Sequence, residues 1–256
     1  MNAVVKRRHR TAFFIMESAA VSILLRAVEM DSKQRYTMAL VLYQEGLQIL
    51  MDLIKETGDP GKKKHFKVKA EEYMNRAETI KIIIQEQKAA GAYREQTRIE
   101  AGSIGYGYAT VFGRFLDASV THVHIEDPYI RLFHQCQNLL RLCELCVQKC
   151  HSLKKVTLVT TQESDERKGQ IANLKELKLS LGMRQISFEF EFSSTLHDRQ
   201  VRLDNGWVIK IGRGLDYFKP SAGKCSLGAC DMDLRQCLET SIDIFHVSQL
   251  TNNTHT

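Results

Sequence analysis

Apolar residues recur every three or four positions through the first third of the chain, which is the spacing of amphipathic helices. The spacing predicts one helix around residues 21–28, a second over 36–54 and a third over 64–93. The longest stripe lies on the third segment and consists of Phe66, Ala70, Tyr73, Ala77, Ile80 and Ile84. Breaks at 31–32 and 57–61 separate the helices. Long helices with short connections predict an antiparallel three-helix bundle.

Strand and helix patterns alternate after residue 96, where a Gly-rich segment follows the helical repeat. Apolar runs predict strands at 120–125, 156–160, 186–192 and 207–211, and helical spacing predicts helices at 132–147 and 171–181. Residues 204–206 (Asp-Asn-Gly) are typical of a hairpin turn. This order predicts an α/β domain with a mixed sheet. The predicted divisions are a basic tail at 1–16, the helical bundle at 17–95, a linker at 96–108 and the α/β domain at 109–250.

The excess of positive charge lies mainly at the N-terminus. The chain has 36 Lys and Arg residues against 30 Asp and Glu residues, a formal net charge of +6. Residues 1–16 contain four basic residues and no acid, whereas 17–96 contain 13 basic and 12 acidic residues and 97–256 contain 19 and 18. Each predicted domain is therefore nearly neutral. We expect no chain-wide basic face and no nucleic-acid partner.

Cysteine content and hydropathy together indicate the compartment. Seven cysteines, an odd number, in a chain of 256 residues are typical of reduced thiols inside the cell. No apolar run reaches the length of about 18 residues that a spanning helix needs. The apolar run at 11–16 is too short for the core of a signal peptide. We therefore expect a cytoplasmic protein.

Four of the cysteines lie close together on one predicted helix. Cys136, Cys143, Cys146 and Cys150 are spaced by seven, three and four residues, and His134 and His151 are nearby. One interpretation is a zinc site, but structural zinc sites usually draw ligand pairs from separate segments on turns. A cysteine-lined core face suits one continuous helix better. His122 and His124 share a strand face without an evident third ligand, so we expect no metal site and no cofactor.

The second and third helices have more apolar positions than a three-helix bundle needs. Met74 and Val41 lie off the main stripes of their helices. A small-residue groove with a Met on its floor and glutamates on its rim would suit an amphipathic helix that carries Lys or Arg. The candidate groove consists of Met74, Glu71, Ala77, Glu78 and Val41. The alternative is that the additional apolar residues belong to the bundle core.

The helical region resembles a known domain. Residues 72–81 resemble the third-helix signature of the microtubule-interacting and trafficking (MIT) domain, and segments between 19 and 46 resemble its first two helices. The resemblance covers about residues 17–93. It implies that C-terminal helices of ESCRT-III subunits bind between the second and third helices, with Met74 at the centre of the groove. A tetratricopeptide repeat is the nearest alternative, but no second copy is present at the period of that repeat.

The most chemically distinctive segment of the α/β region contains His197, Arg199 and Asp204. A His, a cation two positions later and an Asp seven positions after the His have the spacing of a phosphodiesterase motif. In an extended strand, His197 and Arg199 would point to the same face. The imidazole could then attack phosphorus while the guanidinium holds two oxygens. The alternative is a His and an Arg on an ordinary polar strand face.

This segment resembles the His-x-Lys-x4-Asp signature of the phospholipase D superfamily. Residues 125–131, 193–199 and 205–218 resemble, more narrowly, the phospholipase-D-like domain that follows an MIT domain in one family. Two departures count against catalysis: Arg199 replaces the superfamily's Lys, and the chain contains a single copy of the motif, whereas the usual mechanism needs two His. We expect a non-catalytic domain. The alternative is a phosphodiesterase whose homodimer brings two copies of His197 together.

The same resemblance implies what the C-terminal domain binds. It implies homodimerisation through this domain and binding to acidic phospholipids, with phosphoinositides as the expected head groups. The expected lipid contacts are Arg199, Arg202, Lys210, Arg213, Lys219 and Lys224. The expected function is that of an adaptor in protein transport that joins ESCRT-III to membranes during abscission at the end of cytokinesis. The expected sites are the midbody and the late endosome membrane.

Overall fold

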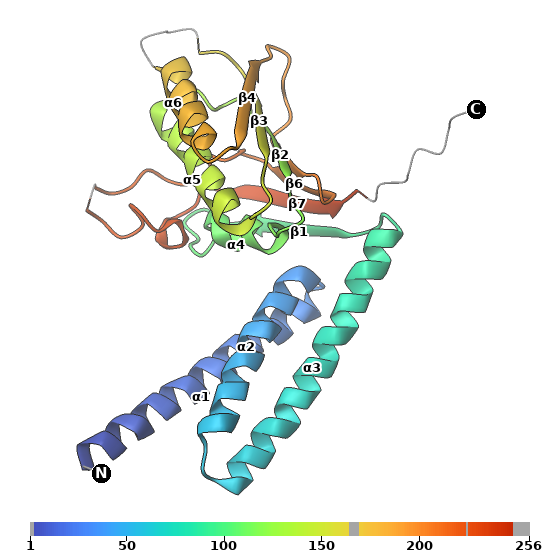
Figure 1. Ribbon diagram of the computed structural model, residues 1–256, viewed down its shortest axis with the longest axis vertical. Helices are drawn as coiled ribbons and strands as arrows, with labels where there is room; N and C mark the ends of the chain where they lie inside the picture. The colour runs from blue at the N-terminus through green and yellow to red at the C-terminus, as the bar shows by residue number, and fades with distance from the viewer. Residues whose placement is uncertain (1–2, 164–168, 224, 248–256) are drawn as a thin grey trace. The chain divides into compact units, whose positions relative to one another are not determined.

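The computed structural model describes residues 3–163, 169–223 and 225–247, with side chains from Ala12 onwards. The chain divides into two compact units, Met1–Ala90 and Gly91–Thr256. The first unit is helical, and the second contains a sheet with helices (Figure 1). None of the described helices combines the length and apolar character that crossing a lipid bilayer requires.

Three long helices form the first unit. They are α1 at Ala3–Ser32, α2 at Tyr36–Glu56 and α3 at Pro60–Ala89. Two ion pairs join α1 to α3 with the same offset along both helices, from Glu17 to Lys62 at 3.2 Å and from Asp31 to Arg76 at 2.7 Å. α1 and α3 therefore run in the same direction and α2 runs antiparallel to both, which confirms the predicted bundle. α1 also extends through most of the segment 1–16, for which the sequence predicted no structure.

The boundaries of α3 differ from those predicted, for local reasons. The helix starts at Pro60 rather than at residue 64 because the Asp59 carboxylate caps it and accepts a hydrogen bond from the Gly61 N–H at 2.8 Å. It ends at Ala89 rather than at residue 93 because Gly91, with φ of 64°, adopts the left-handed conformation that ends many helices.

The bundle core forms where α2 packs against both neighbours. Gly46 lets Leu24 of α1 approach so closely that a Cβ at Gly46 would lie 2.6 Å from the Leu24 side chain. Tyr43 packs against Tyr73 of α3 with ring centroids 5.8 Å apart, and its hydroxyl donates to Asp31 at 3.2 Å. The stripe predicted on α3 is buried at Phe66, Ala70, Ala77, Ile80 and Ile84.

The described part of the second unit contains a seven-stranded sheet with the order β1-β7-β6-β5-β2-β3-β4. Strands β2, β3 and β4 are parallel, and the other neighbours are antiparallel. The bounds are β1 Arg94–Ile99, β2 His122–Glu126, β3 Lys155–Thr160, β4 Ser187–Phe192, β5 Gln200–Leu203, β6 Trp207–Ile211 and β7 Thr240–His246. The predicted α/β class with a mixed sheet is confirmed.

Helices connect the parallel strands, as parallel pairing requires. α5 at Phe133–Lys149 leads from β2 to β3, and α6 at Gln170–Gly182 leads from β3 to β4. Both helices lie on the same side of the sheet (Figure 1). The unit also contains α4 at Tyr108–Phe112 and short 3-10 turns at Gly113–Phe115 and Met232–Leu234.

Strand β1 crosses the boundary that the sequence predicted between the helical bundle and the linker. It spans residues 94–99, and therefore the end of the predicted bundle at 95 and the first part of the predicted linker at 96–108. Its sequence is mostly polar, because β1 is an edge strand in which Glu95 and Ile99 are the buried positions. Arg114 pairs with Glu95 at 2.6 Å, so a buried ion pair occupies a position where the hydrophobic pattern would need an apolar residue.

Helix α5 buries the cysteines that the sequence assigned to a core face. Cys136, Cys143, Cys146 and Cys150 are buried free thiols. Burial raises the pKa of Cys143 to about 12 and that of Cys150 to about 11, so both are protonated near neutral pH. Within the described ranges, no group of three or more His, Cys, Asp or Glu is arranged to hold a metal ion.

Candidate functional site

The three segments that carry the phospholipase-D-like resemblance meet next to the end of β6. Arg199, just before β5, donates a hydrogen bond from Nη1 to the backbone carbonyl of Gly212, just after β6. The same guanidinium lies over the ring of Tyr129, which follows β2, with its Cζ 4.6 Å from the ring centroid. Segments far apart in the sequence therefore meet around one arginine.

A buried carboxylate fixes this junction. Asp127 is 1% exposed and accepts backbone N–H donors from Tyr129 at 3.0 Å and from Leu215 at 2.8 Å. Burial raises the pKa of Asp127, and these backbone hydrogen bonds oppose the rise. Gly214 has φ of 65°, and a Cβ there would overlap the Asp127 carboxylate. The turn after β6 therefore requires glycine at this position.

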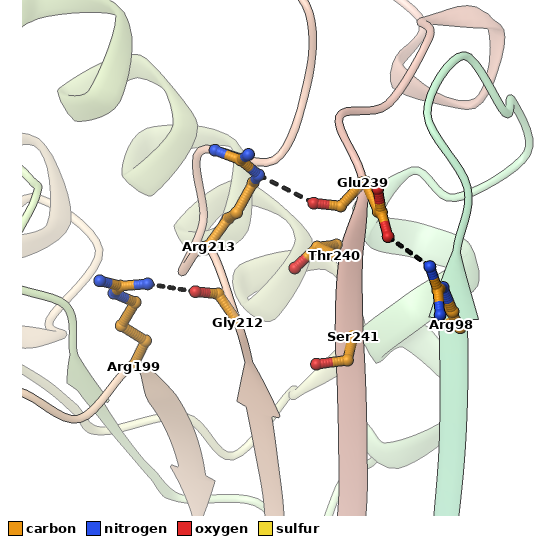
Figure 2. A pocket seen from close by; sticks show the side chains of 7 residues that line it. All are labelled: Arg98, Arg199, Gly212, Arg213, Glu239, Thr240 and Ser241. Carbon is orange, nitrogen blue, oxygen red and sulfur yellow. Dashed lines mark hydrogen bonds and ion pairs between the residues drawn. The ribbon is translucent and has the colours of Figure 1, made fainter.

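A shallow pocket of about 630 Å³ opens beside the junction (Figure 2). We call it the arginine pocket, and it is lined by Arg98, Arg199, Gly212, Arg213, Glu239, Thr240 and Ser241. Arg213 Nε donates to the Glu239 carbonyl at 2.9 Å, and the Glu239 carboxylate pairs with Arg98 at 2.6 Å. Three guanidinium groups and one carboxylate line the pocket. Arg98 pairs with Glu100 at 3.1 Å as well as with Glu239, so the positive charge of the pocket comes from Arg199 and Arg213.

Two buried polar atoms at this pocket have no hydrogen-bond partner in the described part of the chain. They are Arg199 Nε and Thr240 Oγ1, and Thr240 is 8% exposed. Figure 2 shows the side chains of Thr240 and Ser241 pointing from β7 toward Gly212. A Cβ at Gly212 would lie 3.1 Å from Thr240 Oγ1, so the lack of a side chain at Gly212 leaves space next to this buried hydroxyl. A ligand that accepts or donates a hydrogen bond here would satisfy a buried group.

The structure does not bring the three motif residues together. β5 begins after Arg199, so the strand geometry expected for His197 and Arg199 does not apply. Asp204 follows the other end of β5, five residues or roughly 16 Å along an extended chain from Arg199. There its carboxylate accepts a hydrogen bond from the Thr121 N–H at 3.0 Å. Burial alone would raise the pKa of Asp204, but hydrogen bonds from Thr121 and His122 outweigh it and lower the pKa.

The imidazole of His197 is exposed, and the described residues include no hydrogen-bond partner for it. The predicted lipid contacts are also dispersed. Arg199 and Arg213 line the arginine pocket. The others lie elsewhere: Arg202 and Lys210 are on one face of the sheet, Lys219 lines a different pocket, and Lys224 is outside the described residues. The sequence grouped these cations because they are neighbours along the chain, whereas the strands separate them.

Sequence reasoning missed Arg98, Thr240 and Ser241. β1 and β7 pair antiparallel with Arg98 opposite Ser241, so residues near the two ends of the unit become neighbours. No local pattern reveals such a pairing. The alternation of apolar Ile242 and Ile244 with polar neighbours is the signal that could have identified β7 itself.

On the helical unit, three of the four predicted groove residues on α3 are exposed. Met74 is 42% exposed, Glu71 and Glu78 are exposed, and Ala77 is buried. Arg76, which pairs with α1, is two residues from Met74 and therefore lies roughly 160° away around the helix. Met74 thus points away from α1, toward the side on which a groove with α2 would open.

Val41 does not line that groove. On α2, Gly46 contacts α1 and Tyr43 contacts α3. Val41 lies roughly 160° from Tyr43 around the helix. Leu40 and Leu47 lie roughly 60° and 40° from Tyr43, on the side away from Gly46. They take the place that the sequence gave to Val41.

A second apolar recess lies on the other side of α3, between α1 and α3. It has a volume of about 220 Å³, and Leu50 and Phe66 are among the buried residues that line it. At its edge Val21 is 54% exposed and Leu25 is 65% exposed. The sequence did not predict this recess, because its lining comes from three helices.

Comparisons with known proteins match both units. Residues 17–82 match the family model of the MIT (microtubule interacting and transport) domain, and residues 105–246 match that of the phospholipase D-like domain at the C-terminus of MIT. The chain is 45% identical over 230 residues to MIT domain-containing protein 1 of Mus musculus, which covers 90% of this chain and 92% of that protein. The two resemblances noted in the sequence are confirmed.

Proposed function

The chain belongs to the family of MIT domain-containing protein 1, an MIT domain followed by a phospholipase-D-like domain, and from this we propose that it is an adaptor linking ESCRT-III to acidic membranes. The observation that carries the membrane part is the arginine pocket. It combines three guanidinium groups with a buried hydroxyl that lacks a partner among the described residues.

A phosphate group is the ligand that suits the arginine pocket best. Guanidinium groups bind phosphate oxygens through paired hydrogen bonds, and they stay charged at any physiological pH. Arg213 uses its Nε for the Glu239 carbonyl, which leaves its terminal nitrogens for a ligand. Thr240 Oγ1, which is buried in the free protein, could donate to the same ligand if its side chain turned toward the pocket. An acidic phospholipid, above all a phosphoinositide, presents such a group at the membrane surface.

The phospholipase-D-like domain would bind the phosphate without hydrolysing it. The guanidinium of Arg199 is held by Gly212 and Tyr129, and Asp204 is engaged near Thr121 beyond the other end of β5, so the Arg and the Asp of the motif do not share one site. The runner-up is a dimeric phosphodiesterase in which each protomer supplies one His197. A phosphodiesterase assay on the purified full chain separates the two. Turnover that disappears in His197→Ala would overturn the non-catalytic proposal.

The helical unit would bind C-terminal helices of ESCRT-III subunits. The support is the family itself together with the exposed Met74 between Glu71 and Glu78. A basic amphipathic helix could bury an apolar anchor on Met74 and pair its cations with the two glutamates. Leu40 and Leu47 would form the α2 side of the groove.

Homodimerisation through the C-terminal domain would double both kinds of contact. Two helix-binding sites and two lipid-binding sites in one dimer raise the effective concentration of each second contact, so avidity exceeds either single affinity. Such a dimer would remain cytoplasmic and collect on ESCRT-III-coated membranes. On this proposal it acts at the midbody during abscission, at the end of cytokinesis, and on late endosomes.

Co-sedimentation with vesicles tests the lipid-binding part. Arg213→Gln removes one pocket cation without introducing an acid, and we expect about fivefold weaker binding to vesicles that contain a phosphoinositide. The matched control is Arg184→Gln, which removes an exposed arginine that lines neither the arginine pocket nor the pocket around Lys219. Equal binding of the two variants would place the lipid contact away from the arginine pocket.

A further inference from the structure

A second pocket in the α/β unit shares no lining residue with the arginine pocket. It has a volume of about 770 Å³ and lies between α5 and the long connection from β6 to β7. Its cations are Arg141 on α5, and Lys219 and Arg235 on the connection. We call it the connection pocket.

The three cations of the connection pocket are held by neutral groups. Arg141 Nη1 donates to the side-chain oxygen of Asn138 at 2.9 Å. Arg235 donates to the carbonyls of Gly228 at 2.5 Å and Ala229 at 2.8 Å. Lys219 Nζ donates to the side-chain oxygen of Gln236 at 3.3 Å. Across the described parts of the chain, none of the three forms a direct ion pair with an acid.

One carboxylate also lines the pocket, and it is already engaged. Asp216 accepts hydrogen bonds from His134 at 3.2 Å, from Gln135 at 3.1 Å and from Asn138 at 3.0 Å. These donors come from α5, so Asp216 serves to fasten the start of the connection to that helix. Three cations against one carboxylate leave a net positive pocket.

The cations of the connection pocket repel one another, and a bound anion would relieve this repulsion. Burial lowers the pKa of Arg235, and the nearby positive charge of Arg141 lowers it further. Two like charges held close together in a partly buried site disfavour one another. An anion placed between them would replace repulsion with charge-assisted hydrogen bonds.

The same connection presents an apolar side chain to solvent. Leu227 is 89% exposed, the highest value among the large hydrophobic residues of the described chain. Leu227 is two residues from Ala229, which lines the connection pocket. A basic pocket and an exposed leucine on the same connection combine the two attractions that hold peripheral proteins on anionic membranes, charge and apolar insertion. Soluble anions would use the pocket alone, whereas a membrane would use both features.

We propose that the connection pocket binds the phosphorylated head group of an anionic membrane lipid while Leu227 enters the apolar layer of the same leaflet. The proposal rests on the proposed membrane function and adds a second lipid contact to it. Arg141 and Lys219 contact the phosphate oxygens. Arg235 contributes positive charge rather than direct contacts, because backbone carbonyls of the connection already accept hydrogen bonds from its guanidinium.

The first experiment measures binding of the full chain to phosphatidylcholine vesicles that contain phosphatidylinositol bisphosphate. We expect Arg141→Gln to weaken binding about fivefold, as the loss of one cation at an anionic surface should. Arg184→Gln is the matched control. Arg235→Gln is avoided because it would release the connection. The effects of Arg141→Gln and Arg213→Gln should multiply in the double variant, because the two pockets are separate.

The second experiment reports insertion directly. The chain contains one tryptophan, Trp207, which is 5% exposed and gives a constant background. Leu227→Trp should therefore show a blue-shifted emission on these vesicles and quenching by brominated lipid. Leu227→Ser should weaken vesicle binding, yet leave binding of soluble inositol hexakisphosphate at the wild-type level.

Each outcome decides between the sources of the phosphate. If Arg141→Gln and Leu227→Ser both bind vesicles as the wild type does, the connection pocket is not a lipid site. If Arg141→Gln loses the soluble probe while Leu227→Ser keeps vesicle binding, the pocket takes a soluble phosphate and the lipid assignment is overturned. If the wild type itself fails to bind vesicles, the proposed membrane function fails first, and the soluble probe alone then reports on the pocket.

Discussion

Replacing Met74 with alanine tests the helix-binding groove, and the exposed fraction of Met74 sets the expected loss of binding affinity. Met74 is 42% exposed in the free bundle. Complete burial of a Met side chain contributes roughly 1.5–3 kcal/mol, so covering the exposed fraction would contribute about 0.6–1.3 kcal/mol. Met74→Ala should therefore weaken binding about three- to ninefold. Met74→Asp should exceed tenfold, because it also places a charged carboxylate where the apolar anchor of the partner helix would be buried.

The assay is a fluorescence-anisotropy titration of the full chain with labelled peptides from ESCRT-III C-terminal helices. Val68→Ala is the matched control, since Val68 is 47% exposed on α3 and lies roughly 120° from Met74 around the helix. Equal affinities for Met74→Ala and the wild type would refute the reasoning. Loss of binding in Leu25→Asp, with Met74→Ala unaffected, would place the partner helix in the recess between α1 and α3 instead.

Three further predictions concern stability and thiol chemistry. Asp31→Asn should lower the free energy of unfolding by about 1–2 kcal/mol near pH 7, because it disrupts the charge-assisted hydrogen bonds with Arg76. Those bonds hold the pKa of Asp31 below its usual value, so the stabilisation is present above the unfolded pKa of about 3.9 and disappears as pH falls through the lower folded pKa. Urea titrations followed by circular dichroism should show the gap between variant and wild type closing in acid, and a constant gap would contradict this. Gly214→Ala should destabilise the α/β unit by about 3 kcal/mol or more, measured by thermal melting, whereas Gly223→Ala, with nothing within 4 Å of its added Cβ, should melt as the wild type does. A thiol reagent should modify two cysteines in the native chain, Cys225 and Cys230, and the other five only after unfolding, because those five are buried. Rapid reaction of more than two thiols would show that either the α5 face or the segment around Cys237 opens.

The helical unit and the parallel strands were predictable because they bury apolar faces with a regular period. The stripe on α3 from Phe66 to Ile84 matches the buried residues of that helix. β3 is a β-branched run in the centre of the parallel group, where Val156, Leu158 and Thr160 are buried and the residues between them are half-buried. In these elements local pattern and tertiary packing agree.

The arginine pocket was only half predictable, because it depends on strand pairing across the whole unit. Arg199 belongs to a recognisable motif, and Arg213 follows it closely in the sequence. Arg98 and Thr240 come from β1 and β7, whose many polar side chains obscure the apolar alternation that predicts a strand. The pairing register of β1 and β7 brings the two residues together. Grouping cations by sequence distance also failed for Arg202, since the side chains of a strand alternate between faces.

The position of Asp204 shows that the spacing of the motif does not by itself indicate catalysis. Its carboxylate joins the hairpin after β5 to Thr121 at the start of β2, so replacing it would loosen the antiparallel half of the sheet from the parallel half. A chain that carries out no hydrolysis would still use this aspartate to stabilise its sheet. The Asp of the His-x-Lys-x4-Asp signature can therefore be retained because it stabilises the fold. A search for the spacing of that signature would then find relatives with this fold whether or not they are enzymes.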